Sequence, residues 1–505
     1  MKSIILKLLY STNNQSHNNE FDNNYISHPN YPSLLAVTDT LTQLNIENIA
    51  AKVPFKHIDQ LPNKFIAELN VDSQESYLIS KTKEGFIAEN DLGNIIKGTI
   101  AELEKYWAEV ILIIEENEKS LKNKTIENTS FAFPFLLIIF SIITIYNYKS
   151  NLIESVFIVL SSIGLFVSVE ILKTYFKDST SNESKFCTAN QNFSCKSIIS
   201  SKGYSFSKYV EFVDLPIVFF SVAFFSQIFG LNVFYYFGLV SLASIPFLLY
   251  SVYLQKVVLK KWCLLCLITS LIIVLIGGLF ILKIKNYTYN LNNIITLITI
   301  TIILSIAWFF VKKLIKDSKE NIQKLNHLLR FKRNEDVFYK IANTIENKEQ
   351  FETLEKIGIG NKNARNTITL FLSPSCPHCH RAYKDAIELV EKYSEQLKLE
   401  ICFNLNINNL YNPYLDVAKT ILNLYNTNKD YKKALDDWHI KNIKLEDWLS
   451  KWRNTDNFTT ENNQIENQFQ WCAANELNYA PVKIFNGNYL SSEYEINELF
   501  YFFKE

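Results

Sequence analysis

The sequence lacks an excess of charge of either sign, and it has no cysteine before Cys187. Lysine and arginine together number 51, as do aspartate and glutamate, so nothing in the composition indicates a nucleic-acid partner. The first residues, Met1–Leu9, have too short an apolar core and no small-residue cleavage site, so we do not expect a signal peptide. There is no internal repeat. At 505 residues the chain is too long for one domain.

What the sequence does have is paired cysteine. Six of the eight cysteines form three closely spaced pairs: Cys187/Cys195, Cys263/Cys266 and Cys376/Cys379. Such pairing is typical of disulfide chemistry in an oxidising compartment, or of metal binding. The remaining two, Cys402 and Cys472, are expected to be buried and unreactive, with a disulfide between them as the alternative.

Long apolar stretches occupy the middle of the chain. A helix needs about 20 mostly apolar residues to cross a bilayer. Six stretches meet or approach this length: Phe131–Tyr146, Leu152–Phe176, Leu215–Gly230, Leu231–Leu254, Cys263–Leu282 and Ile294–Val311. The first and third are short, so an interfacial or re-entrant segment is the alternative for each. Inside the second, Glu154 is close enough to an end to snorkel, and Glu170 is expected to face other helices or the loop side.

Residues 1–118 are predicted to form a small soluble α/β domain. We expect a helix over 39–44 and strands over 46–53, 76–79, 86–89 and 110–114. The first thirty residues are rich in Asn and Ser, and we expect them to be loose. A transmembrane four- or five-helix bundle is predicted over 131–312, followed by a linker over 313–360 that is helical over 317–333.

Residues 361–505 are predicted to form a second soluble α/β domain. A strand over 366–372 leads to Cys376-Pro377-His378-Cys379, which enters a helix that ends near residue 394. A strand over 397–407, a helical stretch to 474, a strand over 480–485 and a last helix from residue 493 follow.

A Cys-x-x-Cys at a helix N-terminus suits thiol–disulfide exchange. The helix dipole and free N–H groups stabilise a thiolate on Cys376, which makes Cys376 the attacking sulfur and Cys379 the resolving one. His378 is a neighbour that would add positive charge and make the disulfide more oxidising. Ala480-Pro481 has the position of a cis-proline that faces the dithiol and contacts substrate.

This segment resembles the thioredoxin superfamily, and residues 411–474 resemble the helical insertion of its disulfide-oxidoreductase branch. The alternative is a zinc knuckle, for which His380 with Cys402 or Cys472 is the candidate set of further ligands. We expect no metal.

The membrane block resembles the vitamin K epoxide reductase family. The resemblance rests on the loop pair Cys187 and Cys195, on Ser201 six residues later, and on the Cys-x-x-Cys of Cys263 and Cys266 opening a later helix. It covers about 152–311, and fusion to a thioredoxin-like domain is the usual bacterial arrangement of the family. The chain departs from animal members at Ser270, where they carry tyrosine, so vitamin K epoxide and warfarin-type ligands are not transferred.

The resemblance implies a role for each of these cysteines. Cys263 and Cys266 would face a quinone, ubiquinone or menaquinone, with Cys266 nearest to it and Ser201 helping to position it. Cys195 would attack Cys263, and Cys187 would exchange with the thioredoxin-like motif. The alternative for Cys263 and Cys266, taken alone, is two small core residues of a membrane helix.

The N-terminal domain resembles a papain-like, peptidase C39-like domain. The resemblance rests on Tyr31-Pro32-Ser33-Leu34-Leu35 and on the segments that follow it. A cysteine peptidase needs a thiolate and a histidine base, whereas here no cysteine precedes Cys187 and Ser76 stands at the expected histidine position. We therefore expect no peptidase activity. Asn90 or Asp91 would occupy the acidic position, and His28 and His57 are expected at the surface.

Together these patterns predict a quinone-dependent thiol oxidase of the bacterial cytoplasmic membrane that makes disulfides in exported proteins or peptides. All three cysteine pairs must then share the extracytoplasmic side, together with the thioredoxin-like domain. The side of the membrane on which residues 1–118 lie depends on whether 131–146 spans the bilayer. The Lys/Arg distribution does not settle this point. The alternatives are a non-catalytic, peptide-binding export accessory with a membrane anchor, and an enzyme that delivers reducing equivalents outward.

Overall fold

The computed structural model describes residues 1–71, 73–117, 129–147, 152–176, 195–199, 210–231, 233–283, 291–409, 411–453 and 457–503. Its internal contacts divide the chain into two compact units. One comprises Met1–Ile26 and Pro32–Lys324, and the other Ser27–Tyr31 and Leu325–Glu505. The apolar helices and the second soluble domain therefore fall into different units, and each is described by itself.

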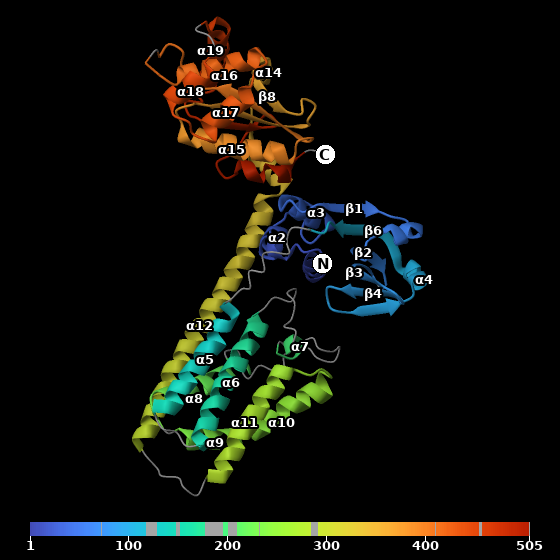
Figure 1. The fold of residues 1–505 in the computed structure, drawn as a ribbon, viewed down its shortest axis with the longest axis vertical. Coiled ribbons are helices and arrows are strands. Elements are labelled where there is room, and N and C mark those ends of the chain that lie inside the picture. The colour runs from blue at the N-terminus through green and yellow to red at the C-terminus, as the bar shows by residue number, and fades with distance from the viewer. Residues whose placement is uncertain are drawn as a thin grey trace. The chain divides into compact units, whose positions relative to one another are not determined.

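The N-terminal region is an antiparallel sheet with helices, as Figure 1 shows in blue. The strand order is β1-β6-β2-β3-β4-β5. The strands are β1 (Asn48–Lys52), β2 (Lys64–Asn70), β3 (Gln74–Thr82), β4 (Gly85–Asn90), β5 (Ile95–Gly98) and β6 (Trp107–Ile114). The helices are α1 (Lys2–Ser11), α2 (Asn18–Ile26), α3 (Leu34–Gln43) and α4 (Ile100–Leu103). A small α/β fold for this region is thus confirmed.

Two expectations for this region are wrong. The first thirty residues are not loose, because α1 and α2 are regular helices and α1 buries Ile4 and Leu8, one helical turn apart, in the core. His28 is not a surface residue: it is 1% exposed, its ring accepts a hydrogen bond from the Asn30 N–H, and it lies against the ring of Tyr501.

Apolar helices make up the middle of the chain. They are α5 (Thr129–Asn147), α6 (Leu152–Phe176), α7 (Cys195–Ile199), α8 (Asp214–Ile228), α9 (Phe234–Ala243), α10 (Ile245–Tyr253) with the π-helical segment η6 (Leu254–Val258), α11 (Leu264–Lys283) and α12 (Leu291–Lys332). Among the described residues, α6, α11 and α12 are long and apolar enough to cross a membrane. The pair α9 and α10–η6, bent by 44°, adds a fourth span if it is counted as one. Helices α5 and α8 are shorter.

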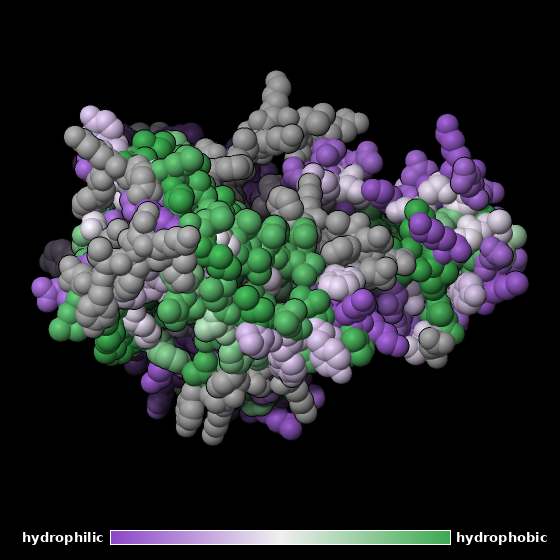
Figure 2. All heavy atoms as spheres, turned by 90° about the horizontal axis from the view of Figure 1, so that it is seen from below, coloured by the Kyte–Doolittle hydropathy of each residue, from purple (hydrophilic) through white to green (hydrophobic). Residues whose placement is uncertain are grey.

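Close packing holds α6, α8, α9 and α11 together. Small residues allow the approach: a Cβ at Gly164 would meet the Phe220 ring at 2.2 Å, and one at Gly238 would meet Phe280 at 2.4 Å. The outer faces carry apolar side chains, with Ile302, Ile306 and Phe310 of α12 each more than half exposed. Figure 2 shows hydrophobic residues gathered over this part of the surface. Such a surface fits a membrane bundle.

The two predicted acidic residues of α6 have lysine partners. Glu154 pairs with Lys283 at 3.2 Å near one end of the bundle, and Glu170 pairs with Lys173, one turn along the same helix, at 2.7 Å. A lysine therefore balances the negative charge of each carboxylate, as charged groups near a bilayer require.

The C-terminal domain has a mixed sheet of order β7-β12-β11-β9-β10-β8. The strands are β7 (Asn343–Thr344), β8 (Ile357–Gly360), β9 (Asn366–Leu372), β10 (Leu397–Phe403), β11 (Val482–Phe485) and β12 (Asn488–Tyr489). β9 and β10 are parallel and joined by α15 (Pro377–Lys392), whereas β11 runs antiparallel to β9. The stretch predicted as a linker, 313–360, thus contains two strands of this sheet.

The predicted helical insertion lies between β10 and β11. It consists of α16 (Leu415–Asn426), α17 (Tyr431–His439), α18 (Leu445–Trp452) and α19 (Thr459–Ala474). Ahead of β8 come α13 (Glu335–Ile341) and α14 (Lys348–Thr353). Two expected boundaries are wrong: β10 ends at Phe403 rather than 407, and the last helix is a 3-10 helix, η8 (Ile496–Phe502), that begins later than 493.

Candidate active site

Cys263 occupies the N-cap position of α11. Its carbonyl oxygen accepts the N–H of Leu267 at 3.0 Å, and its Sγ accepts the N–H of Cys266 at 3.3 Å. A side chain that accepts an N–H of the first turn is what defines a helix cap. The Cys-x-x-Cys spacing therefore sets one sulfur at the helix end and directs an N–H donor onto it, which would stabilise negative charge there.

Gln255 of η6 holds the backbone segment that leads into this N-cap. Its Oε1 accepts the N–H of Cys263 at 2.9 Å, and its carbonyl oxygen accepts the N–H of Lys261 at 3.1 Å. Lys260, just before Lys261, has the left-handed backbone conformation, with a positive φ of 50°. Gln255 is 1% exposed. A buried amide thus closes the turn from η6 into α11, and a π-helical segment at such a place is typical of functional sites.

A third thiol lies beside this pair. Cys195, the first residue of α7, is linked to Cys263 by a side-chain hydrogen bond, and Cys263 is linked in the same way to Cys266. Cys195 and Cys263 are fully buried, whereas Cys266 is partly exposed. The structure thus brings three predicted site cysteines together around Cys263. Cys187 and Ser201 lie outside the described residues.

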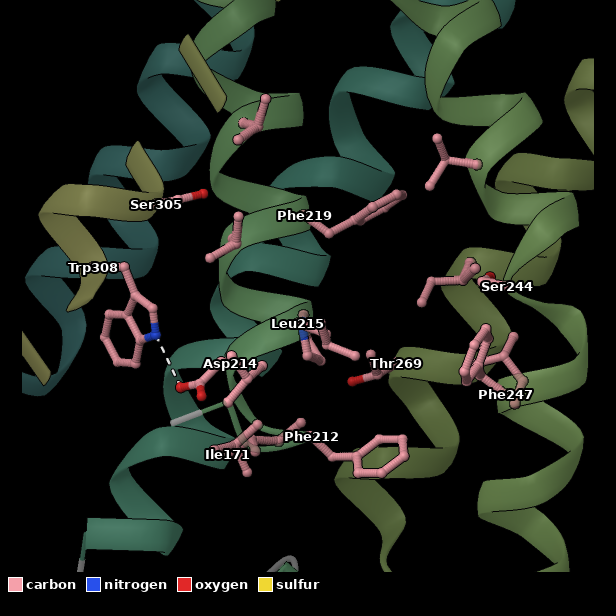
Figure 3. A pocket seen from close by; sticks show the side chains of 18 of the residues that line it. Ile171, Phe212, Asp214, Leu215, Phe219, Ser244, Phe247, Thr269, Ser305 and Trp308 are labelled. Carbon is pink, nitrogen blue, oxygen red and sulfur yellow. Dashed lines mark hydrogen bonds between the residues drawn. The ribbon is translucent and has the colours of Figure 1, made fainter. Parts of the chain in front are cut away.

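Cys266 borders a large apolar pocket between the helices. The pocket has a volume of about 600 Å³, within the usual range for small-molecule sites. Its walls are mainly aliphatic and aromatic and come from α6, α8, α9, α10, α11 and α12. Figure 3 shows Phe219, Phe247 and Leu215 around it, with the Thr269 hydroxyl on one side and Asp214 and Trp308 on another. Ser270, one turn beyond Cys266, also lines it.

The C-terminal domain carries the second dithiol. Cys376 is the N-cap residue of α15 and is partly exposed, whereas Cys379 is fully buried. Burial raises the pKa of the Cys379 thiol, and its Sγ accepts the N–H of Ser373 at 3.3 Å. The Ala480–Pro481 peptide bond is cis, as expected, and Cys376 donates to the Ala480 carbonyl oxygen at 3.3 Å. The predicted attacking sulfur is thus the accessible one.

Comparisons with known proteins match two segments of the chain. Residues 155–283 match the vitamin K epoxide reductase family, and residues 352–484 match a thioredoxin family. The chain therefore carries a vitamin K epoxide reductase domain and a thioredoxin-like domain. Neither match extends into residues 1–118, and no match was found among curated proteins.

The chain is also similar to several solved structures. One is ScsC of Proteus mirabilis in a transitional conformation, at 14% identity over 38% of this chain and 91% of that chain, with a TM-score of 0.26. Another is the thiol-disulfide exchange protein α-DsbA2 of Wolbachia pipientis, at 22% identity over 30% and 87%, with a TM-score of 0.24. A third is oxidised BdbD of Bacillus subtilis, at 12% identity over 32% and 93%, with a TM-score of 0.25.

The vitamin K epoxide reductase domain has a charged group that sequence analysis missed. Asp214, at the first turn of α8, lines the pocket and is 3% exposed. Its Oδ2 contacts the Lys312 Nζ at 2.6 Å, and its Oδ1 accepts the Trp308 Nε1–H at 2.9 Å. Sequence analysis assigns no partner to Lys312, and 98 residues separate it from Asp214. The sole signal in the sequence is that each stands at the end of an apolar run.

The histidines of the thioredoxin-like domain differ in their surroundings. His378 is exposed and directly precedes Cys379. His380 points instead at His439, with 3.0 Å between their Nδ1 atoms. Cys402 and Cys472 are buried, as predicted, and each is a free thiol. Within the described ranges, no three His, Cys, Asp or Glu side chains form a group that could hold a metal.

Proposed function

We propose that this protein is a membrane thiol oxidase that takes two electrons from thiols of exported proteins or peptides and passes them to a quinone. A thiol–disulfide oxidoreductase is what the two domains together support. The quinone as acceptor, the order of transfer and the bacterial cytoplasmic membrane as location are the parts that we propose.

One observation carries the proposal. Cys263 contacts the thiol of Cys195 on one side and that of Cys266 on the other, and Cys266 borders the apolar pocket. A sulfur that can exchange with a loop cysteine is therefore one step from a sulfur that faces a hydrophobic site. A pocket of this size and character suits a lipid-soluble two-electron acceptor.

Each transfer is a thiolate attack on a disulfide through a mixed disulfide. A client dithiol would reduce the Cys376–Cys379 disulfide and would itself be oxidised. The new dithiol would reduce a Cys187–Cys195 disulfide, with Cys187 as the sulfur attacked. Cys195 would then attack a Cys263–Cys266 disulfide, and that dithiol would reduce the quinone to quinol. Ser201 is proposed to help position the quinone.

In the thioredoxin-like domain, the partly exposed Cys376 beside cis-Pro481 would bind the client, with the exposed His378 close to it in sequence. Helix α12 continues past Lys312 to Lys332 without a break. This extension would connect the bundle to the thioredoxin-like domain. We further propose that residues 1–118 form a C39-like domain without peptidase activity.

A Cys266→Ala variant in membranes tests the function. With dithiothreitol and added ubiquinone or menaquinone, the wild type should reduce the quinone and the variant should not. Mild oxidation of the variant should trap a Cys195–Cys263 disulfide, because the resolving sulfur is missing. Cys472→Ala is the matched control, since it removes a buried thiol of the other domain and should leave turnover unchanged. Quinone reduction at the wild-type rate by Cys266→Ala would refute the proposal.

A further inference from the structure

A chain of charged side chains runs from the wall of the pocket to the surface of the bundle. Lys312 contacts Asp214 at 2.6 Å and Glu211 at 3.3 Å, and Glu211 contacts Lys316 at 3.1 Å. Exposure rises along this chain. The Asp214 and Lys312 side chains are 3% and 6% exposed, whereas those of Glu211 and Lys316 are 21% and 49% exposed. One end therefore touches the pocket and the other touches solvent.

Three elements, α12, α8 and α6, contribute to this chain of charged side chains. Lys312 and Lys316 stand one turn apart on α12, and Asp214 begins α8 with Glu211 just before it. From α6, the Tyr175 hydroxyl forms a hydrogen bond with Glu211. Trp308 of α12 donates to Asp214, which also accepts the Glu211 N–H at 2.8 Å. These are the titratable and polar groups that the described residues direct at Asp214 and Glu211.

An ion pair in this position needs an explanation. Removing two charges from water costs several kcal/mol per ion, and packed apolar residues of similar volume often serve stability as well or better. A further interhelical pair, Glu154–Lys283, is more exposed on both sides, and neither residue lines the pocket. In the buried pair, Asp214 lies on the pocket wall, where Figure 3 shows its carboxylate beside Trp308.

We propose that Lys316, Glu211, Lys312 and Asp214 conduct a proton from water to the quinone. This inference rests on the proposed function. Oxidation of the Cys263 and Cys266 dithiol supplies two electrons, and quinol formation consumes two protons. One proton comes from the Cys266 thiol beside the quinone, while the Cys263 thiol proton leaves on the side of Cys195 rather than into the pocket. The relay replaces it: the Lys312 ammonium passes a proton to the Asp214 carboxylate, the carboxyl group so formed protonates a quinone oxygen, and Glu211 and Lys316 restore the proton on Lys312 from solvent.

The other polar groups of the pocket are less suited to protonating a quinone oxygen. Its other polar side chains are hydroxyls such as Ser244, Thr269, Ser270 and Ser305, along with the Trp308 indole. The Ser270 hydroxyl donates to the Cys266 carbonyl and the Thr269 hydroxyl to the Leu265 carbonyl, each within its own helix. Hydroxyl and indole groups are poor general acids, whereas a carboxyl group that can receive a proton from a neighbouring ammonium is a usual one.

Asp214→Asn is the variant that tests the relay. It keeps the size of the side chain and an oxygen acceptor for Trp308, but it removes the proton-carrying group. With the wild type reducing quinone, we expect Asp214→Asn to be slower by roughly tenfold or more. We also expect the ratio of variant to wild-type rate to fall as the pH rises from about 6 to about 8, because protons must then come from dilute hydronium. The solvent deuterium isotope effect on turnover should increase.

Glu154→Gln is the matched control, because it breaks the partly buried pair with Lys283 away from the pocket. It should change neither the rate ratio nor its pH dependence. Formation of the Cys195–Cys263 mixed disulfide should proceed normally in Asp214→Asn, since that step moves no proton to quinone. Glu211→Gln, at a more exposed site, provides a second test if Asp214→Asn does not fold, and it should show the same pH trend.

The outcomes separate the two proposals. Failure of the wild type to reduce quinone would overturn the proposed function. Quinone reduction by the wild type, together with an unchanged rate, pH dependence and isotope effect in Asp214→Asn, would overturn only the relay. A lower unfolding temperature without any change in the pH dependence would also overturn the relay, because the Asp214–Lys312 pair would then only stabilise the contact between α8 and α12.

Discussion

The side-chain oxygen of Gln255 accepts a hydrogen bond from the backbone N–H of Cys263 at 2.9 Å. This bond links the π-helical turn of η6 to the N-terminus of α11, where the reactive pair lies. A Gln255→Leu variant leaves a buried donor unpaired, which costs about 1–3 kcal/mol. We expect it to destabilise the bundle and to slow quinone reduction, since the Cys263 backbone is no longer fixed. Thermal unfolding and quinone absorbance measure the two effects.

Gln227→Leu separates these effects. Gln227 is also a buried glutamine of the bundle, with hydrogen bonds to Ser161 at 3.2 Å and to the Ala223 carbonyl at 2.7 Å. It does not contact the cysteines. Its replacement should lower the unfolding temperature to a similar extent and leave the rate of the folded protein unchanged. Equal loss of rate in both variants would show that Gln255 acts through general stability alone.

The two sulfurs of the thioredoxin-like motif should differ in reactivity. Cys376 is partly exposed at the N-terminus of α15, whereas Cys379 is buried and burial raises the pKa of its thiol. Because the thiolate is the reactive form, iodoacetamide should alkylate Cys376 well before Cys379 in the reduced native protein. Peptide mass spectrometry after timed quenching checks the order, and the difference should vanish in urea. Faster labelling of Cys379 would reverse the assigned roles.

Acid should destabilise the thioredoxin-like domain through His439. Burial and the neighbouring His380 lower the pKa of His439 to about 3. An unfolded histidine titrates near 6.5, so the neutral form is favoured in the folded state. Its contribution to stability is complete above about pH 6.5 and is lost progressively as the pH falls toward 3, by up to about 1.36 kcal/mol per pH unit.

A His439→Gln variant should therefore lose less stability than the wild type between about pH 7 and about pH 5. Thermal unfolding of the full chain, followed by circular dichroism at each pH, provides the measurement. His378→Gln is the control, because His378 is exposed and its replacement should leave the wild-type acid dependence intact. An identical acid dependence in His439→Gln would contradict the prediction.

The α6–α8 contact should not tolerate even one methyl group. A Cβ at Gly164 would lie 2.2 Å from the ring of Phe220, which is itself fully buried. We expect Gly164→Ala to cost about 1–3 kcal/mol through overpacking. At Gly278 of α11 a Cβ would meet nothing within 4 Å, so Gly278→Ala should be neutral or slightly stabilising. Unfolding temperatures of the two variants in the same detergent provide the comparison.

The parts of the fold that sequence predicted well have strong local patterns. The strand over 366–372 has the same bounds in the structure, because a stretch of threonine and apolar residues ends at the turn before the Cys-x-x-Cys. Helix α1 was missed although Ile4, Ile5, Leu8 and Leu9 follow a helical period, because the Asn- and Ser-rich composition of the following residues was given more weight.

Long-range relationships were the harder part of the site. The cysteines could be found from their spacing, yet the contact of Cys195 with Cys263 needs two segments 68 residues apart to fold together. Lys312 and Asp214 show the same limit, since nothing local to either residue specifies the other. Gln255 was missed because the predicted helix ended one residue before it. The role of Gln255 depends on the geometry of the turn from η6 into α11, which the local sequence pattern does not predict.

Cys263 is wholly enclosed, with the loop sulfur on one side and the pocket-lining Cys266 beyond it. Small soluble oxidants and reductants, glutathione among them, thus have no direct route to this sulfur. Under the proposed function, electrons would enter this dithiol through Cys195 and leave it through Cys266. The redox state of the medium would then act on the quinone only by way of thiols that exchange with Cys195.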